Sequence, residues 1–183
     1  MGKVHYVDKA EFYARICDYK KACREAKKAK KPKPQITTYL CRCIMLIAEN
    51  LSYTPKYSNY SFRDEMVDDA IENCIMYFDN FNEKKYKNPF GYFTQISIYA
   101  FWRRIAKEKK HLYTKYKVAQ QSGLMDEDLS QEIEDGLVVP TQLYDNIQDF
   151  IREYENKELE RKSKNKIKKE KIKPTGKIEK FME

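Results

Sequence analysis

Apolar residues recur at steps of three and four in several windows of this chain. That spacing places apolar side chains on one face of an α-helix, whereas a β-strand alternates at every second position. The 183 residues include only five glycines and six prolines, so few positions interrupt the helical period. The sequence therefore predicts an all-α fold.

Five helices are predicted between the interruptions. Asp8 is a suitable N-cap for the first helix, and Lys-Pro-Lys-Pro at 31–34 ends it. Ser61 is a suitable N-cap for the third helix, and Pro89 fits the first turn of the fourth. The predicted spans are about 8–30, 38–51, 62–78, 89–110 and a last helix that contains Leu143, Ile147, Phe150, Ile151 and Tyr154.

Prolines and runs of charge divide the chain into four parts. A helical extension at 1–34 precedes one domain of ordinary size at 35–122. An acidic, partly helical segment at 123–160 and a basic tail at 161–183 follow. The second predicted helix is apolar enough to be central in the domain. The basic run at 161–173 is expected to be solvated and mobile on its own.

The third predicted helix has an acidic side. Its apolar stripe is predicted to be buried and contains Met66, Val67, Ala70, Ile71, Cys74, Ile75 and Phe78. The opposite side presents Glu65, Asp68, Asp69, Glu72 and Asn73. Carboxylates this close repel one another, which is unfavourable unless a basic partner covers them.

The fourth predicted helix is rich in aromatic residues. Within thirteen positions it has Phe90, Tyr92, Phe93, Tyr99, Phe101 and Trp102. These rings are distributed around the helix, so a core can cover only some of them. The structural alternative is that Tyr92, Ile96, Tyr99 and Ala100 pack inward. The surplus of rings, followed by cations, favours nucleic acid, because bases stack on exposed rings while cations hold the backbone. Those cations are Arg103, Arg104, Lys107, Lys109 and Lys110.

Charge favours an anionic partner over an acidic small molecule. Cationic residues exceed anionic ones by eight, and the pI is about 9.1. The charge is also segregated, since 20–33 and 161–173 are strongly basic and 124–160 is acidic. A basic surface that only confers solubility remains the alternative. The five cysteines form no CxxC pair and lie far from both histidines, which argues against zinc and for a reducing cytosol.

No catalytic signature is present. The chain has no Walker A loop, no GxGxxG and no HExxH, so we expect a protein that is not an enzyme and has no cofactor, metal or catalytic residue. Asp68 and Asp69 are a poor metal pair, because adjacent helical residues point about 100° apart. No apolar run or signal peptide directs the chain to a membrane, so a cytoplasmic location is expected.

The segment at 65–104 resembles the conserved second region of bacterial sigma factors. Glu65-Met66-Val67-Asp68-Asp69-Ala70 falls on a D-L-x-Q-E-G pattern, and Phe81-Asn82 falls on the F-D that follows. Tyr92, Thr94 and Gln95 fall on F-x-T-Y, with Ile98 and Tyr99 at the paired tryptophans. Gln95 and Ile98 depart from the aromatic residues of the family, and Phe101 and Trp102 lie one turn later.

Among sigma factors, the likeness is greatest to the late-transcription sigma factors of T-even-like bacteriophages. It covers IMLIAENLS (44–52), DEMVDDAIE (64–72), NEKKYKNPFGYFTQ (82–95) and RRIAKEKK (103–110). The chain end GKIEKFME resembles the motif by which that family attaches to the DNA sliding clamp. The residues of this clamp-binding likeness are Ile178, Phe181, Met182 and Glu183.

The resemblance implies a factor that binds bacterial core RNA polymerase, recognises and helps open an AT-rich promoter element, and works with a sliding clamp and a late co-activator in the host cytoplasm. It implies that polymerase binds Glu65, Asp68, Asp69, Glu72 and Asn73. It implies that promoter DNA binds Tyr92, Thr94, Gln95, Ile98, Tyr99, Trp102, Arg103, Arg104 and Lys107. Two alternatives stay open: a general single-stranded nucleic-acid binding protein, and an accessory protein that binds polymerase without touching DNA.

Overall fold

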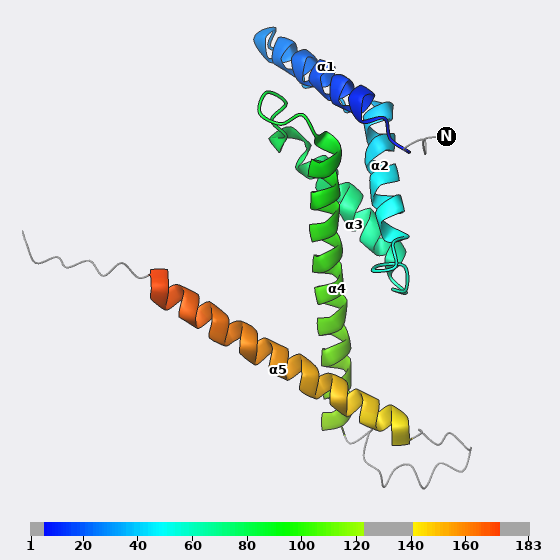
Figure 1. Cartoon of the computed structure of the whole chain (residues 1–183), viewed down its shortest axis with the longest axis vertical. Helices are drawn as coiled ribbons and strands as arrows, with labels where there is room; N and C mark the ends of the chain where they lie inside the picture. Colours follow the sequence, from blue (N-terminus) through cyan, green and yellow to red (C-terminus); the bar gives the residue numbers. More distant parts are fainter. Residues whose placement is uncertain (1–5, 123–140, 173–183) are drawn as a thin grey trace, which may run out of the picture. The chain divides into compact units, whose positions relative to one another are not determined.

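The computed structural model describes residues 6–122 and 141–172, and its regular structure in these ranges is helical. This confirms the predicted all-α fold. Figure 1 labels α1 (Lys9–Lys28), α2 (Thr38–Ser52), α3 (Arg63–Met76), α4 (Pro89–Gln121) and α5 (Thr141–Ile172), and a short 3-10 helix, η1 (Phe78–Asn80), follows α3. None of these helices has a stretch long and apolar enough to cross a bilayer. The chain divides into two compact units, Met1–Glu108 and Lys109–Glu183.

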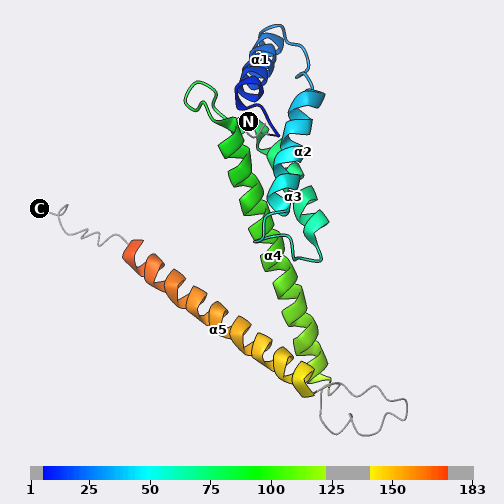
Figure 2. The same cartoon turned by 45° about the vertical axis from the view of Figure 1, so that its right-hand side comes forward.

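The first unit has a core to which α1, α2, α3, η1 and α4 all contribute. Asp8 caps α1 as predicted, because its carboxylate accepts hydrogen bonds from the backbone N–H groups of Ala10 and Glu11. Figures 1 and 2 show α1 lying across the end of the unit at which α2 and α4 begin. The core includes Phe12, Ile16, Tyr19, Leu40, Ile44, Ile47, Cys74, Phe78 and Phe93. α1 is therefore part of the core of this unit rather than an extension from it.

A second cluster of buried residues fixes the loop between α2 and α3 against α4. It contains Ala48, Tyr57, Met66, Ala70, Ala100 and Phe101. Tyr57 lies edge-on to Phe101, with ring centroids 5.0 Å apart and an interplanar angle of 84°. This contact positions the residues around Tyr57 beside the exposed face of α4.

α3 differs from its prediction at both ends and on one face. Phe62 occupies the N-cap position without a side-chain hydrogen bond, so the predicted Ser61 cap is wrong. The helix ends at Met76 instead of Phe78. Ile75 was predicted to be buried but is 44% exposed. The buried stripe is narrower than predicted, because its members lie four residues apart and Ile75 is about 100° beyond Cys74.

In the second unit, the last turns of α4 pack against α5. Tyr113 stacks on Tyr154 with a centroid distance of 4.4 Å, and Tyr116 contacts Phe150 edge-on at 5.7 Å. α4 thus continues past its predicted end near 110. α5 continues through most of the basic run that was expected to be mobile. Pairs of opposite charge one turn apart support this extension, including Glu160 with Lys164.

Candidate functional site

Packing covers one side of α4 and leaves a pair of rings on the other. Phe93, Ala100 and Phe101 are buried, whereas Tyr99 and Trp102 are 50% and 47% exposed. The two exposed rings meet edge-on, with centroids 5.6 Å apart and an interplanar angle of 73°. Part of the aromatic surplus in the sequence therefore forms one accessible ring pair, which we call the Tyr99–Trp102 pair.

The indole of Trp102 is held by the α2–α3 loop. Its Nε1 donates a hydrogen bond to the Tyr57 hydroxyl at 3.1 Å, and Tyr57 itself is buried. The loop is shaped by Thr54, whose carbonyl accepts from the backbone N–H of Tyr57 at 2.9 Å and of Ser58 at 3.0 Å. Trp102 is thus fixed in orientation although half of its surface is exposed.

Cations lie next to these rings. The Nζ of Lys56 is 5.2 Å from the centroid of the Trp102 ring and 5.4 Å from that of Tyr57. A second pair joins Arg63, the first residue of α3, to Tyr53, which directly follows α2. The guanidinium of Arg63 is 4.9 Å from the centroid of the Tyr53 ring, and Tyr53 is 65% exposed. Such pairs combine a stacking face with a charge that attracts phosphate. The DNA-binding residues predicted from the sequence include none of Tyr53, Lys56, Tyr57 and Arg63. The signal in the sequence was a loop rich in Tyr and Ser.

The predicted DNA-binding residues of α4 differ in exposure. Gln95 is exposed one turn before Tyr99, and Arg103 and Lys107 are exposed one and two turns after it. Thr94 and Ile98 are half-buried, and the Thr94 hydroxyl donates to the Phe90 carbonyl at 2.8 Å.

Tyr92 belongs to the packed side of α4. Its ring contacts Phe81 and Phe93, each with centroids 5.2 Å apart, and its hydroxyl donates to the Tyr77 carbonyl at 3.1 Å. Burial raises the pKa of this phenol. The alternative that these residues pack inward is therefore correct for Tyr92 and Ala100 but not for Tyr99, which is exposed.

The predicted acidic face of α3 is divided by contacts with α4. Glu65, Asp68 and Glu72 are exposed. Asp69 is half-buried and accepts two hydrogen bonds from Arg104, at 2.7 Å from Nε and 2.8 Å from Nη2. This bond to Asp69 raises the pKa of the Arg104 guanidinium, which therefore stays charged.

Asn73 is also engaged within the chain. Its amide oxygen accepts from Arg103 at 2.6 Å, and its amide nitrogen donates to the Asp69 carbonyl at 2.6 Å. The structure therefore brings two residues predicted to bind polymerase, Asp69 and Asn73, into contact with two predicted to bind DNA. Of the five residues predicted to bind polymerase, Glu65, Asp68 and Glu72 remain exposed.

The most buried cysteine has a structural environment. The Cys74 thiol lies 3.5 Å from the Ser97 hydroxyl and 3.6 Å from the Phe93 carbonyl, and its burial raises the pKa to about 11. It therefore stays protonated at neutral pH. Within 6–122 and 141–172, no three Cys, His, Asp or Glu side chains gather in a way that could hold a metal ion.

The predicted clamp-binding residues, Ile178, Phe181, Met182 and Glu183, lie outside the described residues, as does the acidic stretch at 126–135. No protein-family model matches the chain, and no curated protein matches it at a significant level.

Proposed function

We propose that this protein is a sigma-type initiation factor for phage late promoters, which docks on bacterial core RNA polymerase through α3 and holds an unpaired, AT-rich promoter strand on α4. One observation supports it most: the Tyr99–Trp102 pair is exposed and fixed on α4, while Glu65, Asp68 and Glu72 are exposed on α3 of the same unit. Catalysis would belong to the polymerase.

The ring surface suits unpaired bases better than a duplex. A base that has left the duplex offers a free face for stacking, and each such contact contributes roughly 1–3 kcal/mol. The hydrogen bond from Trp102 to Tyr57 fixes the indole in advance, which lowers the entropy lost on binding. Lys56, Arg103 and Lys107 then supply charge for the phosphates of the strand.

The acidic residues suit a basic protein surface. Glu65, Asp68 and Glu72 lie three and four residues apart, on one side of α3, so a partner that contacts one reaches the others. A basic polymerase helix would relieve their mutual repulsion. By resemblance, the chain end at Ile178, Phe181, Met182 and Glu183 would attach the factor to the sliding clamp, where a late co-activator also acts.

Co-elution with bacterial core RNA polymerase on size exclusion tests the docking step. The test variant is Asp68→Lys/Glu72→Lys, which leaves the Asp69–Arg104 pair intact. The control is Asp18→Lys/Glu25→Lys, which changes the net charge equally at exposed positions of α1. We expect the wild type and the control to co-elute and the test variant to elute alone. Co-elution of the test variant, or failure of the wild type, would contradict the proposal.

A second candidate is a single-stranded nucleic-acid binding protein that needs no polymerase. The exposure of the Tyr99–Trp102 pair in the free chain favours it. This candidate predicts tight, salt-sensitive binding of single strands by the free protein. The sigma-type factor instead predicts weak binding that strengthens when core polymerase is added, so fluorescence anisotropy with and without polymerase separates the two.

A further inference from the structure

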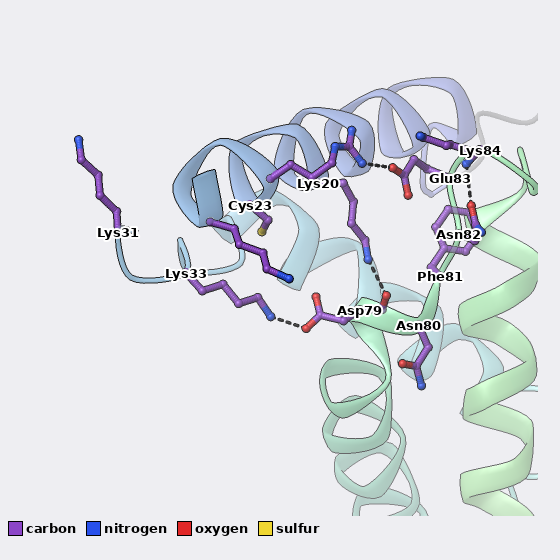
Figure 3. Close-up of a pocket in the computed structure, with 12 residues that line it drawn as sticks. Lys20, Cys23, Lys31, Lys33, Asp79, Asn80, Phe81, Asn82, Glu83 and Lys84 are labelled. Carbon is purple, nitrogen blue, oxygen red and sulfur yellow. Dashed lines mark hydrogen bonds and ion pairs between the residues drawn. The ribbon is translucent and has the colours of Figure 1, made fainter. Parts of the chain in front are cut away.

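A second cationic surface lies away from the ring pair, in a pocket of about 770 Å³ between the C-terminal half of α1 and the chain from η1 toward α4. Figure 3 shows side chains from both walls turned toward this space. Six cationic side chains line it: Lys20, Arg24, Lys27, Lys31, Lys33 and Lys84. Only two carboxylates do so, those of Asp79 and Glu83, which leaves a net charge of plus four.

Both carboxylates are neutralised within the pocket wall. Glu83 forms an ion pair with Arg24 and its side chain is only 12% exposed, and the hydrogen bond from Arg24 holds the pKa of Glu83 below its usual range. Asp79 forms an ion pair with Lys33, and Lys20 donates to the Asp79 carbonyl at 2.6 Å (Figure 3). An incoming anion therefore meets little repulsion from these groups.

Three lysines of the pocket remain available. Within the described part of the chain, no carboxylate forms an ion pair with Lys27, Lys31 or Lys84, and all three are exposed. In Figure 3 the Lys31 side chain extends away from the space between α1 and Asp79, so its charge lies at the edge of the pocket, whereas Lys84 lies on the opposite wall beside Glu83.

The spacing of the cations suits a chain of phosphates. Lys20, Arg24 and Lys27 follow one another at steps of four and three residues, so they form one stripe along α1. The stripe is about 10 Å long, which equals the rise of roughly three phosphates along one nucleic-acid strand. The aromatic ring in the lining, Phe81, is only 2% exposed, so the pocket offers no stacking face for a base.

We propose that this pocket binds the phosphate backbone of a nucleic acid without reading its sequence. The cations continue along α1 and past its end, farther than a single phosphate group reaches. Lysine ammonium groups contact phosphate oxygens as point charges and need no fixed register. The proposal does not depend on the proposed function, because backbone binding at the pocket requires neither polymerase nor the Tyr99–Trp102 pair.

The test is fluorescence anisotropy of a labelled DNA duplex of about 20 base pairs with the full chain, over salt from about 50 to 200 mM. Lys27→Glu/Lys31→Glu changes the pocket. Lys21→Glu/Lys28→Glu is the matched control, since both residues are exposed on α1 and outside the lining. We expect the pocket variant to lose about tenfold or more in affinity at low salt, with a salt slope lower by about two. The control should lose less than about threefold.

Equal losses of affinity in the two variants would overturn the proposal, because the attraction would then come from the overall charge of the chain. No loss of affinity in either variant would also overturn it. Unlabelled competitors identify the ligand. Displacement of the duplex by inorganic triphosphate or by polyglutamate as readily as by unlabelled duplex, at equal charge, would overturn the nucleic-acid assignment in favour of a small polyphosphate or an acidic protein.

Discussion

Asp68 and Asp69 are adjacent in α3 but have opposite environments. Asp68 is exposed, whereas Asp69 is half-buried and holds the Arg104 guanidinium with both carboxylate oxygens. Charge reversal of both residues together would mix a loss of partner binding with a loss of folding. Single substitutions separate the two roles.

We expect Asp69→Asn to lower the free energy of unfolding by about 1–2 kcal/mol, because among the described residues it leaves Glu108 as the charged partner of the Arg104 guanidinium. Asp68→Asn should change it by less than about 0.5 kcal/mol. Urea denaturation followed by circular dichroism measures both. Equal effects of the two substitutions would contradict the role given to the Asp69–Arg104 pair.

Cys74 makes the free energy of unfolding depend on pH in the alkaline range. The pKa of its thiol is 9.0 when exposed, and burial raises it to about 11 in the folded chain. Between these pH values the native state therefore keeps a proton that the unfolded chain releases. The stabilising effect is complete below pH 9 and is lost as pH rises toward 11. We expect the free energy of unfolding of the wild type to fall by about 1–2 kcal/mol more than that of Cys74→Ala over this interval. Parallel pH profiles would contradict this.

At the scale of the helices, the sequence pattern located most starts and fewer ends. Pro89 begins α4 as predicted, and Asp8 caps α1, since both signals depend on local geometry. α4 ends at Gln121 rather than near 110, because Tyr113 is covered by Tyr154 from a segment distant in sequence. A helical period cannot report a contact of that kind.

In the candidate site, too, the sequence predicted what depends on local spacing and missed what depends on distant contacts. The surplus of rings on α4 predicted an exposed aromatic surface, and Tyr99 and Trp102 are exposed. Their neighbour Tyr57 lies 45 residues from Trp102, and Asp69 lies 35 residues from Arg104, so neither partnership follows from local spacing. Only the fold brings these side chains together.

Ring contacts hold α5 against the last turns of α4, and we expect Tyr154→Ala to loosen it. The substitution removes stacking on Tyr113. Hydrogen exchange of the full chain should show protection in α5 lowered by about tenfold, while α1, α2 and α3 keep theirs because their core is separate. Leu159→Ala is the control, since Leu159 is 64% exposed on the same helix. Unchanged protection in Tyr154→Ala would show that this contact is not needed.

At the scale of the whole molecule, the two units differ in how much apolar surface they bury. The first unit has two clusters of buried residues, whereas the described part of the second buries chiefly Ile147 and Ile151. Stability should therefore differ between the units.

We expect the second unit to unfold at a lower urea concentration than the first. Trp102 is the single tryptophan of the chain and reports on the first unit, whereas helical circular dichroism reports on both. The dichroism should begin to fall before the tryptophan fluorescence changes. Coincident curves would instead indicate one cooperative transition.

The contacts of Arg103 with Asn73 and of Arg104 with Asp69 have a consequence for how the two faces of the first unit communicate. In the free chain, residues of α3 hold two guanidinium groups that belong to the proposed DNA-binding surface. A partner that draws Asp69 or Asn73 to itself releases those groups, and DNA that draws Arg103 away favours the partner in return. Thermodynamic linkage makes the two effects equal in free energy. Under the proposed function, the free protein would therefore bind DNA weakly, and its docking partner would strengthen that binding.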